Sequence, residues 1–213
     1  MLKNIYRGLL VCIDGANGSG KSTIIKKLSN KLIQDKIKVK LTKEPTNTKL
    51  GDFARNESEV INGNALACLA TADRYEHLKN EIIPALQEGQ VVLCDRYILS
   101  SFIFQGMDGV DYDFINDLNS RIIAPDIQIV LYASVDEIQN RLKERRGFTR
   151  FEKNNQTDLE IQCLQKGIKY LKNQNVNIYE FNTEDDIISN VERIYNIIVS
   201  YIEKSRWLIW VEK

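Results

Sequence analysis

Short apolar segments alternate with longer amphipathic segments along almost the whole chain. The apolar segments, which we expect to form strands, are residues 9–13, 38–41, 91–94, 127–132 and 176–181. Apolar positions at helical spacing predict helices at residues 22–34, 64–87, 112–123, 135–143, 158–172 and 186–203. Strands that are apolar at successive positions are typical of a sheet covered on both faces. The pattern therefore predicts an α/β fold in three layers, with a five-stranded parallel sheet flanked by helices.

No feature of the sequence divides this pattern into separate parts. The 213 residues contain no repeat, low-complexity segment or linker, and 43% hydrophobic and 27% charged residues are ordinary globular values. We expect residues 1–213 to form a single domain with a polar loop at about residues 143–157. The apolar tail at residues 205–213 contains two tryptophans, which we expect to pack on the domain or to make a dimer contact.

Net charge narrows the possible partners, and the cysteine content narrows the cellular compartment. The formal net charge is zero, so no overall basic field favours nucleic acid or a membrane as a partner. The N-terminal apolar run is too short for a secretory signal or a membrane span. None of the four cysteines forms a C-x-x-C pair, and Cys12 and Cys94 lie in predicted strands. We expect all four, Cys12, Cys68, Cys94 and Cys163, to be buried, reduced thiols in a cytoplasmic protein.

A phosphate-binding loop is the most specific motif in the chain. Residues 15–22 read GANGSGKS and match G-x-x-x-x-G-K-[ST] completely, after a predicted strand and before a predicted helix. Glycines allow the backbone to turn its N–H groups toward phosphate oxygens, and the helix N-terminus adds its positive dipole. Lys21 would bridge the β- and γ-phosphates of ATP, and the Ser22 hydroxyl would bind Mg²⁺. The residues expected to hold this cofactor are Gly15, Asn17, Gly18, Ser19, Gly20, Lys21, Ser22 and Thr23.

The lack of a second motif, typical of GTPases, narrows the class of phosphate-loop protein. Guanine-specific GTPases need an N-K-x-D loop after a later strand, whereas the only Asn-Lys pair here is Asn30-Lys31, inside the first predicted helix. The sequence therefore argues against a GTPase and leaves nucleotide kinases and ATP-driven switches.

An acidic and a basic residue follow the third predicted strand. Asp95 and Arg96 come directly after the apolar residues 91–94. Ligands bind at the carboxyl ends of parallel strands, so we expect Asp95 near the Mg²⁺ beside the phosphate loop. Arg96 provides a fork of N–H donors that suits a second phosphate. An acceptor that is already an ionised phosphate needs positioning and charge neutralisation more than a general base.

The order and spacing of further motifs resemble the thymidylate kinase family of nucleoside monophosphate kinases. The resemblance covers nearly the whole chain. It implies the P-loop kinase fold with a short lid, ATP and Mg²⁺, a small nucleotide substrate that is most simply dTMP, and a homodimer. The motifs that carry it, besides the phosphate loop, are TKEP (42–45), ADRYEH (72–77), DRY (95–97), SSFIFQG (100–106), APD (124–126) and RFE (150–152).

Residue by residue, the resemblance implies a site for the acceptor nucleotide. Arg96 would hold the acceptor phosphate, and Arg74 would donate to a carbonyl of the pyrimidine. Phe104 would lie against the sugar and favour deoxyribose, while Ser101 and Gln105 would face the base. The other positions expected to bind substrate are Asp14, Glu44, Pro45, Arg55 and Ala70. The resemblance and the loop together give catalytic roles to Lys21, Asp95 and Arg96, and make Ser22 and Asp95 the expected metal ligands.

The polar loop at about residues 143–157 corresponds to the lid of the family that the chain resembles. Members place a catalytic arginine either in the phosphate loop or in the lid, and this phosphate loop has Gly18 at that position. Arg146 and Arg150 are therefore expected to neutralise charge on the transferred phosphoryl group as the lid closes. Arg145 is expected to stack on adenine.

Two departures from the family pattern leave more than one function open. Asn17 stands where the family has an acidic residue, and Ala70 stands where an aromatic residue stacks on thymine. Base stacking contributes roughly 1–3 kcal/mol, so the pocket could instead serve another or a modified pyrimidine nucleotide. A deoxynucleoside kinase, with Asp14 or Glu44 as its base, and a nucleotide-binding regulatory module without turnover are also compatible with the sequence.

Overall fold

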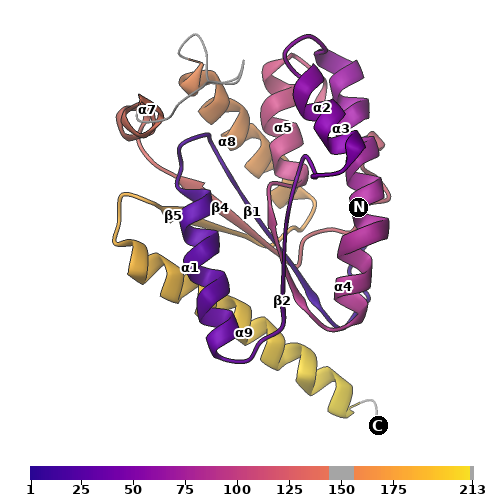
Figure 1. Cartoon of the computed structure of the whole chain (residues 1–213), viewed down its shortest axis with the longest axis vertical. Coiled ribbons are helices and arrows are strands. Elements are labelled where there is room, and N and C mark those ends of the chain that lie inside the picture. The colour runs from indigo at the N-terminus through magenta and orange to yellow at the C-terminus, as the bar shows by residue number, and fades with distance from the viewer. Residues whose placement is uncertain (144–155, 212–213) are drawn as a thin grey trace.

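The computed structural model of the chain describes residues 1–143 and 156–211, with side chains up to residue 204 (Figure 1). Its strands are β1 (Leu9–Gly15), β2 (Val39–Lys43), β3 (Val91–Asp95), β4 (Ile127–Tyr132) and β5 (Ile178–Asn182). Its helices are α1 (Lys21–Gln34), α2 (Lys49–Glu57), α3 (Gly63–His77), η1 (Leu78–Ile82), α4 (Ile83–Gln87), α5 (Ile98–Met107), α6 (Tyr112–Leu118), α7 (Val135–Lys143), α8 (Thr157–Asn173) and α9 (Ile187–Val211).

The strands form one parallel sheet in the order β2-β3-β1-β4-β5. The central strand β1 pairs with β3 and β4, so that Cys12 lies opposite Cys94 on one side and Gln128 on the other. This arrangement confirms the predicted α/β fold and its five parallel strands. Because β1 and β3 are neighbours, the loops that follow them lie side by side at the carboxyl edge of the sheet.

Helices cover both faces of the sheet, as the continuous apolar character of its strands predicts. Alternate side chains of each strand point to opposite faces. Leu10 and Cys12 of β1 pack in a core with α3, α4, α5, α6 and α8. Val11 and Ile13 pack in a second core with α1 and α9, which cover the other side of the sheet in Figure 1. The phosphate loop itself packs through Ala16 in a third, smaller cluster with Ala133, Ile138 and Leu142.

Two helices near the candidate site have no counterpart among the predicted elements. Seven of the ten residues of α5 are buried, so the helix lacks the polar face that would reveal a helical period. The nine residues of α2 bury only Gly51 and Ala54, which leaves almost no apolar stripe. Sequence periodicity therefore missed both helices for opposite reasons.

The boundaries of three predicted helices also differ from the structure. The predicted helix at residues 64–87 is interrupted by the π-helical turn η1 directly before Pro84, which has no N–H to donate and crowds the preceding turn. α6 ends at Leu118, whereas α9 continues to Val211. The side chains of residues 205–213 lie outside the described part, and with them the predicted packing of the tail.

All four cysteines are free thiols, and only Cys68 is exposed. This confirms the buried positions predicted for Cys12, Cys94 and Cys163. The prediction is wrong for Cys68, which lies on the exposed side of α3. Over the described residues, no helix combines the length and apolar character that spanning a membrane would require.

Candidate active site

The phosphate loop connects β1 to α1 at the carboxyl edge of the sheet. Gly15, Gly18 and Gly20 have positive φ values of 152°, 81° and 86°. Gly15 has a second reason to be glycine, because a Cβ there would lie 2.2 Å from the carbonyl oxygen of Leu131 in β4. The N-terminus of α1 has no side-chain cap, so no capping side chain competes with an anion for the N–H groups at the start of the helix.

Lys21 is folded back into this loop. Its Nζ donates to the carbonyl oxygens of Gly15 and Ala16 at 2.9 and 2.8 Å. Burial, followed by the positive charge of Arg96, lowers the pKa of Lys21 to about 7, against the opposing effect of Asp95. The site therefore holds a cation that is only partly charged at neutral pH and that an anion would stabilise.

Two carboxylates lie beside the loop and have different surroundings. Asp14 is fully buried and accepts from Ser100 Oγ, from the Tyr97 N–H and from Gln128 Nε2. These bonds tie β1 to β4 and α5, and Asp14 does not line the adjoining cavity. Asp95, at the end of β3, has a buried Oδ1 with no hydrogen-bond partner among the described residues. Such an oxygen is available to a cation or to its water ligands.

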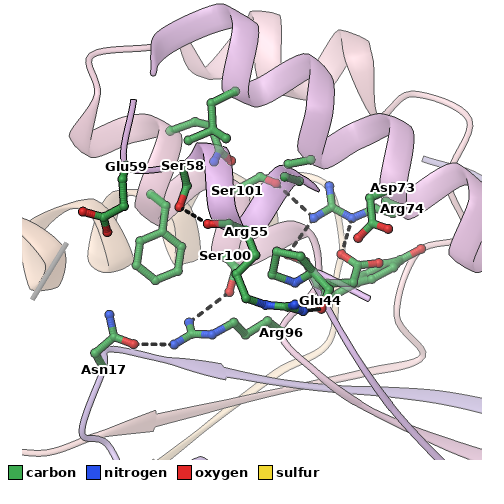
Figure 2. A pocket seen from close by; sticks show the side chains of 17 residues that line it. Asn17, Glu44, Arg55, Ser58, Glu59, Asp73, Arg74, Arg96, Ser100 and Ser101 are labelled. Atoms are coloured by element: carbon green, nitrogen blue, oxygen red, sulfur yellow. Dashed lines mark hydrogen bonds and ion pairs between the residues drawn. The ribbon is translucent and has the colours of Figure 1, made fainter. Parts of the chain in front are cut away.

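Arg96 lies where the loop after β3 meets the phosphate loop. Its Nη2 donates to Asn17 Oδ1 at 2.6 Å, its Nη1 donates to Ser100 Oγ at 3.4 Å, and its guanidinium lies 4.9 Å from the centroid of the Phe104 ring (Figure 2). Its backbone has a φ of 71°, which is uncommon for a residue other than glycine. Three of its five N–H groups are not used by these bonds, so it can still receive an anion.

A residue that the sequence analysis did not single out reaches the phosphate loop from α8. Glu160 is 2% exposed, and its Oε1 accepts from the Asn17 N–H at 2.8 Å. Asn17 therefore contacts a carboxylate through its backbone and Arg96 through its side chain. No signal in the sequence pairs residues 143 positions apart, because this contact depends on how α8 packs on α5.

A cavity of about 200 Å³ opens beside Arg96, beneath α2, α3 and α5 (Figure 2). Arginine side chains line it from α2, from α3 and from the loop after β3, and apolar side chains of α2, α3 and α5 line it as well. The residues that line it are Asn17, Glu44, Pro45, Ala54, Arg55, Ser58, Glu59, Leu66, Ala70, Asp73, Arg74, Arg96, Tyr97, Ser100, Ser101, Phe104 and Gln105. Cationic groups together with apolar surface suit a phosphorylated ring compound.

Arg74 is more completely hydrogen-bonded than Arg96. Its Nε donates to Glu44 Oε2 at 2.8 Å, and its two terminal nitrogens donate to Asn119 Oδ1, the Tyr97 carbonyl and Ser101 Oγ. Burial is the strongest single effect and would lower the pKa of Arg74, but the charge and hydrogen bond of Glu44, together with Tyr97 and Asp14, outweigh burial and raise it. These contacts use four of the five N–H groups, so one on Nη1 remains for the predicted contact with a base.

The segment after β2 forms one wall of the cavity and is held from two sides. Thr46 donates through its N–H and its hydroxyl to the carboxylate of Asp73 in α3, at 2.8 and 2.6 Å. Arg55 of α2 donates to the carbonyl oxygens of Pro45 and Thr46 at 2.7 and 2.8 Å. Arg55, which we expect to bind substrate, thus also holds this segment in place.

Gly51 controls how closely α2 approaches this segment. A Cβ at Gly51 would lie 2.3 Å from the Thr46 carbonyl oxygen and 2.6 Å from its nitrogen. We therefore expect Gly51→Ala to displace the segment and to lower the free energy of unfolding by about 1–3 kcal/mol. Chemical denaturation would measure the loss. The exposed neighbour Lys49 provides the control, Lys49→Ala, and equal stability of the two variants would contradict the prediction.

One group of described residues has the composition of a metal site. Glu44, His77 and Cys94 are buried and place their potential ligand atoms within 4.8 Å of one another. Each of these atoms already has a partner: Glu44 contacts Arg74 and His77, His77 also contacts Thr42, and Cys94 donates to a carbonyl oxygen. We therefore interpret the group as a hydrogen-bonded network.

The predicted substrate residues meet at the cavity, with Asp14 as the exception described above. The predicted lid arginines, Arg145, Arg146 and Arg150, lie outside the described residues. Lining residues to which the sequence analysis gave no role are Ala54, Ser58, Glu59, Leu66, Asp73, Tyr97 and Ser100. Asp73, Tyr97 and Ser100 belong to motifs recognised in the sequence, and this could have indicated them.

Comparison with known proteins connects this geometry to one family. A family model described as thymidylate kinase matches residues 13–194. A probable thymidylate kinase of Pyrococcus horikoshii is 35% identical over 205 residues, which cover 92% of this chain and 97% of that protein. One of Thermococcus kodakarensis is 34% identical over 92% of this chain and 97% of that protein. The thymidylate kinase of Caldicellulosiruptor saccharolyticus is 42% identical over 64% of this chain and 70% of that protein.

Proposed function

The chain belongs to the thymidylate kinase family, and on this premise we propose that it transfers the γ-phosphate of ATP to dTMP, forming ADP and dTDP. The observation that carries the proposal is the direct connection between a complete phosphate loop and an arginine-lined cavity. Asn17 belongs to the loop and carries no charge, yet its Oδ1 binds Arg96 of the cavity at 2.6 Å. Two adjacent anion sites suit the transfer of a phosphoryl group from one nucleotide to another.

The cavity offers groups that match the parts of a pyrimidine nucleotide. The free N–H groups of Arg96 are placed to bind the acceptor phosphate. Phe104, whose ring contacts that guanidinium, provides an apolar surface for the sugar. Gln105 Oε1 is buried with no hydrogen-bond partner among the described residues, and an N–H of the base would supply one. The remaining N–H of Arg74 is available to a carbonyl of the same base.

The transfer needs positioning and charge neutralisation from the protein. An oxygen of the acceptor phosphate attacks the γ-phosphorus while the bond to the β–γ bridging oxygen breaks and its electron pair leaves with ADP. Lys21 and the N–H groups of α1 would hold the donor phosphates, and Arg96 would hold the acceptor against them. No side chain has to remove a proton, because the attacking oxygen is already ionised.

The residues at the loop also fit a divalent cation. The orphaned Asp95 Oδ1 and the Ser22 hydroxyl at the start of α1 are oxygen donors of the type that Mg²⁺ prefers. We propose that these two residues hold Mg²⁺, Asp95 through water. The cation would neutralise charge on the donor phosphates.

Three further parts of the proposal rest on the resemblance to the family. Arg146 and Arg150 would neutralise the transferred group from the lid, and Arg145 would stack on adenine. A homodimer is proposed as well, and light scattering on the purified chain tests it. The free cysteines support placement in a reducing compartment such as the cytoplasm.

The proposed function is tested by an ADP-release assay with MgATP and a panel of nucleoside and deoxynucleoside monophosphates, with thymidine included. We expect turnover with dTMP to exceed that with every other acceptor. A preference for another monophosphate would reassign the substrate and implicate Ala70. Turnover with thymidine would favour a deoxynucleoside kinase, and ATP binding without turnover would favour the regulatory module.

The lowered pKa of Lys21 predicts that ATP binding takes up a proton. Donor phosphates favour the charged ammonium and should raise the pKa of Lys21 from about 7 toward its ordinary value. At pH 8 the free site is mostly neutral, so binding should take up about one proton, whereas at pH 6 it should take up almost none. Calorimetry of MgATP binding in buffers of different ionisation enthalpy measures this uptake. Equal uptake at both pH values would contradict the prediction, and Lys21→Met should abolish the difference.

A further inference from the structure

His77 is the only histidine in the chain, and its buried side chain lies one turn after Arg74 on α3. It does not line the cavity, but it contacts a residue that does. Its Nδ1 lies 3.0 Å from Glu44 Oε1, and its Nε2 lies 2.6 Å from Thr42 Oγ1 in β2. The imidazole therefore bridges the cavity wall and an edge strand of the sheet.

Hydrogen-bond counting fixes one proton of this imidazole. The Glu44 carboxylate receives Arg74 on Oε2, and as an anion it can only accept at Oε1. His77 must therefore carry a proton on Nδ1 and donate it to Glu44. Its Nε2 either accepts from the Thr42 hydroxyl or, in the imidazolium form, donates to Thr42 while that hydroxyl donates to Glu81 at 3.2 Å. The bond to Glu44 is the same in both forms.

This bond determines the orientation of Glu44 and, through it, of Arg74. A carboxylate anchored at one oxygen can still turn about its terminal torsion, whereas one anchored at both oxygens cannot. Glu44 is anchored at Oε1 by His77 and at Oε2 by Arg74. Arg74 in turn keeps the Ser101 hydroxyl and the Tyr97 carbonyl in place at the cavity.

We propose that His77 is a positioning residue for the acceptor nucleotide, because its Nδ1 proton holds Glu44 in the orientation that aligns Arg74 with the base. This inference rests on the proposed function, since it assigns His77 to recognition of dTMP. It assigns His77 no contact with ATP and no part in proton transfer. Loss of the bond should therefore raise the KM for dTMP and leave the KM for ATP unchanged.

Two substitutions separate this role from simple core packing. The amide of Asn can occupy the position of Nδ1 and donate to Glu44, whereas the amide of Gln reaches the position of Nε2. We expect His77→Gln to raise the KM for dTMP about tenfold, within the range for loss of a hydrogen bond to a charged group. His77→Asn should keep it within about threefold, although both variants lose the same ring. Both should keep the KM for ATP within about twofold of wild type.

The matched control is Glu76→Gln, the exposed neighbour on the same helix, which should leave both KM values unchanged. Thermal denaturation of all variants shows whether a rise in the KM for dTMP instead accompanies a loss of folding stability. Equal KM values for dTMP in the Asn and Gln variants, or a parallel rise in the KM for ATP, would overturn the role of His77 in an active enzyme. An inactive wild type would instead overturn the proposed function, and this inference with it.

Discussion

Arg96→Ala should lower kcat/KM for dTMP by about 10²- to 10³-fold while the affinity for ATP stays within about twofold of the wild-type value. Among the described residues that line the cavity, Arg96 is the cation that contacts the phosphate loop, through Asn17. Its removal leaves the acceptor phosphate without the fork that would position it. The donor site keeps Lys21 and the free N-terminus of α1, so ATP binding should persist.

Steady-state kinetics with both substrates and calorimetry with ATP measure the two effects separately. Arg96→Lys keeps the charge but not the fork and should recover part of the lost activity. The exposed Arg121 supplies the control, because Arg121→Ala removes an equal charge from a residue that does not line the cavity. Normal turnover in Arg96→Ala would remove Arg96 from the acceptor site.

The complementary expectation concerns the donor site. Lys21→Met should lower kcat by about 10³-fold, because the positive charge that would follow the γ-phosphate is lost from its buried position in the loop. Binding of dTMP alone should remain close to wild type, since the hydrogen bonds of Lys21 to described residues stay within its own loop and Lys21 does not line the cavity.

Quench-flow measurement of ADP formation and calorimetry with dTMP test this pair of results. Lys27→Met provides the control, as Lys27 is an exposed lysine on the same helix. A large loss of dTMP affinity in Lys21→Met would show that the two sites are not separable in the way that the geometry indicates. Loss of Arg96 should thus impair the use of dTMP and preserve ATP binding, whereas loss of Lys21 should impair phosphoryl transfer and preserve dTMP binding.

Much of the fold follows from local patterns. The central strands β1, β3 and β4 are apolar at nearly all successive positions because each face of the sheet meets a separate core, and this made them recognisable. The edge strands β2 and β5 are only partly buried and include polar residues. The helix α5 was not recognisable, although it contributes Ser101, Phe104 and Gln105 to the cavity. Its side chains face neighbours on nearly every side, so the contrast between apolar and polar positions that reveals a helix is missing.

Some residues of the candidate site could likewise be predicted from the sequence, and others could not. The phosphate loop, Arg96 and Arg74 could be found because their chemistry is carried by contiguous motifs. Glu160 could not, because its contact with Asn17 joins residues that are distant in sequence. His77 lies in one of these motifs, three residues after Arg74, but its contact with Glu44 could not be read from the sequence. Asn17 was singled out for the carboxylate that its position lacks. The structure shows that Glu160 supplies a carboxylate to the backbone of this same residue.

The left-handed backbone of Arg96 has a consequence for anyone who would engineer this protein. An L side chain at a φ of 71° carries a penalty of roughly 1–2 kcal/mol that glycine would not carry. At position 96, glycine would therefore favour thermal stability, whereas turnover requires arginine. A selection for variants that merely survive heating would tend to replace this arginine and yield robust, inactive protein. Stabilising efforts should leave position 96 fixed and look for gains on the outer surfaces of α1 and α9, away from both anion sites.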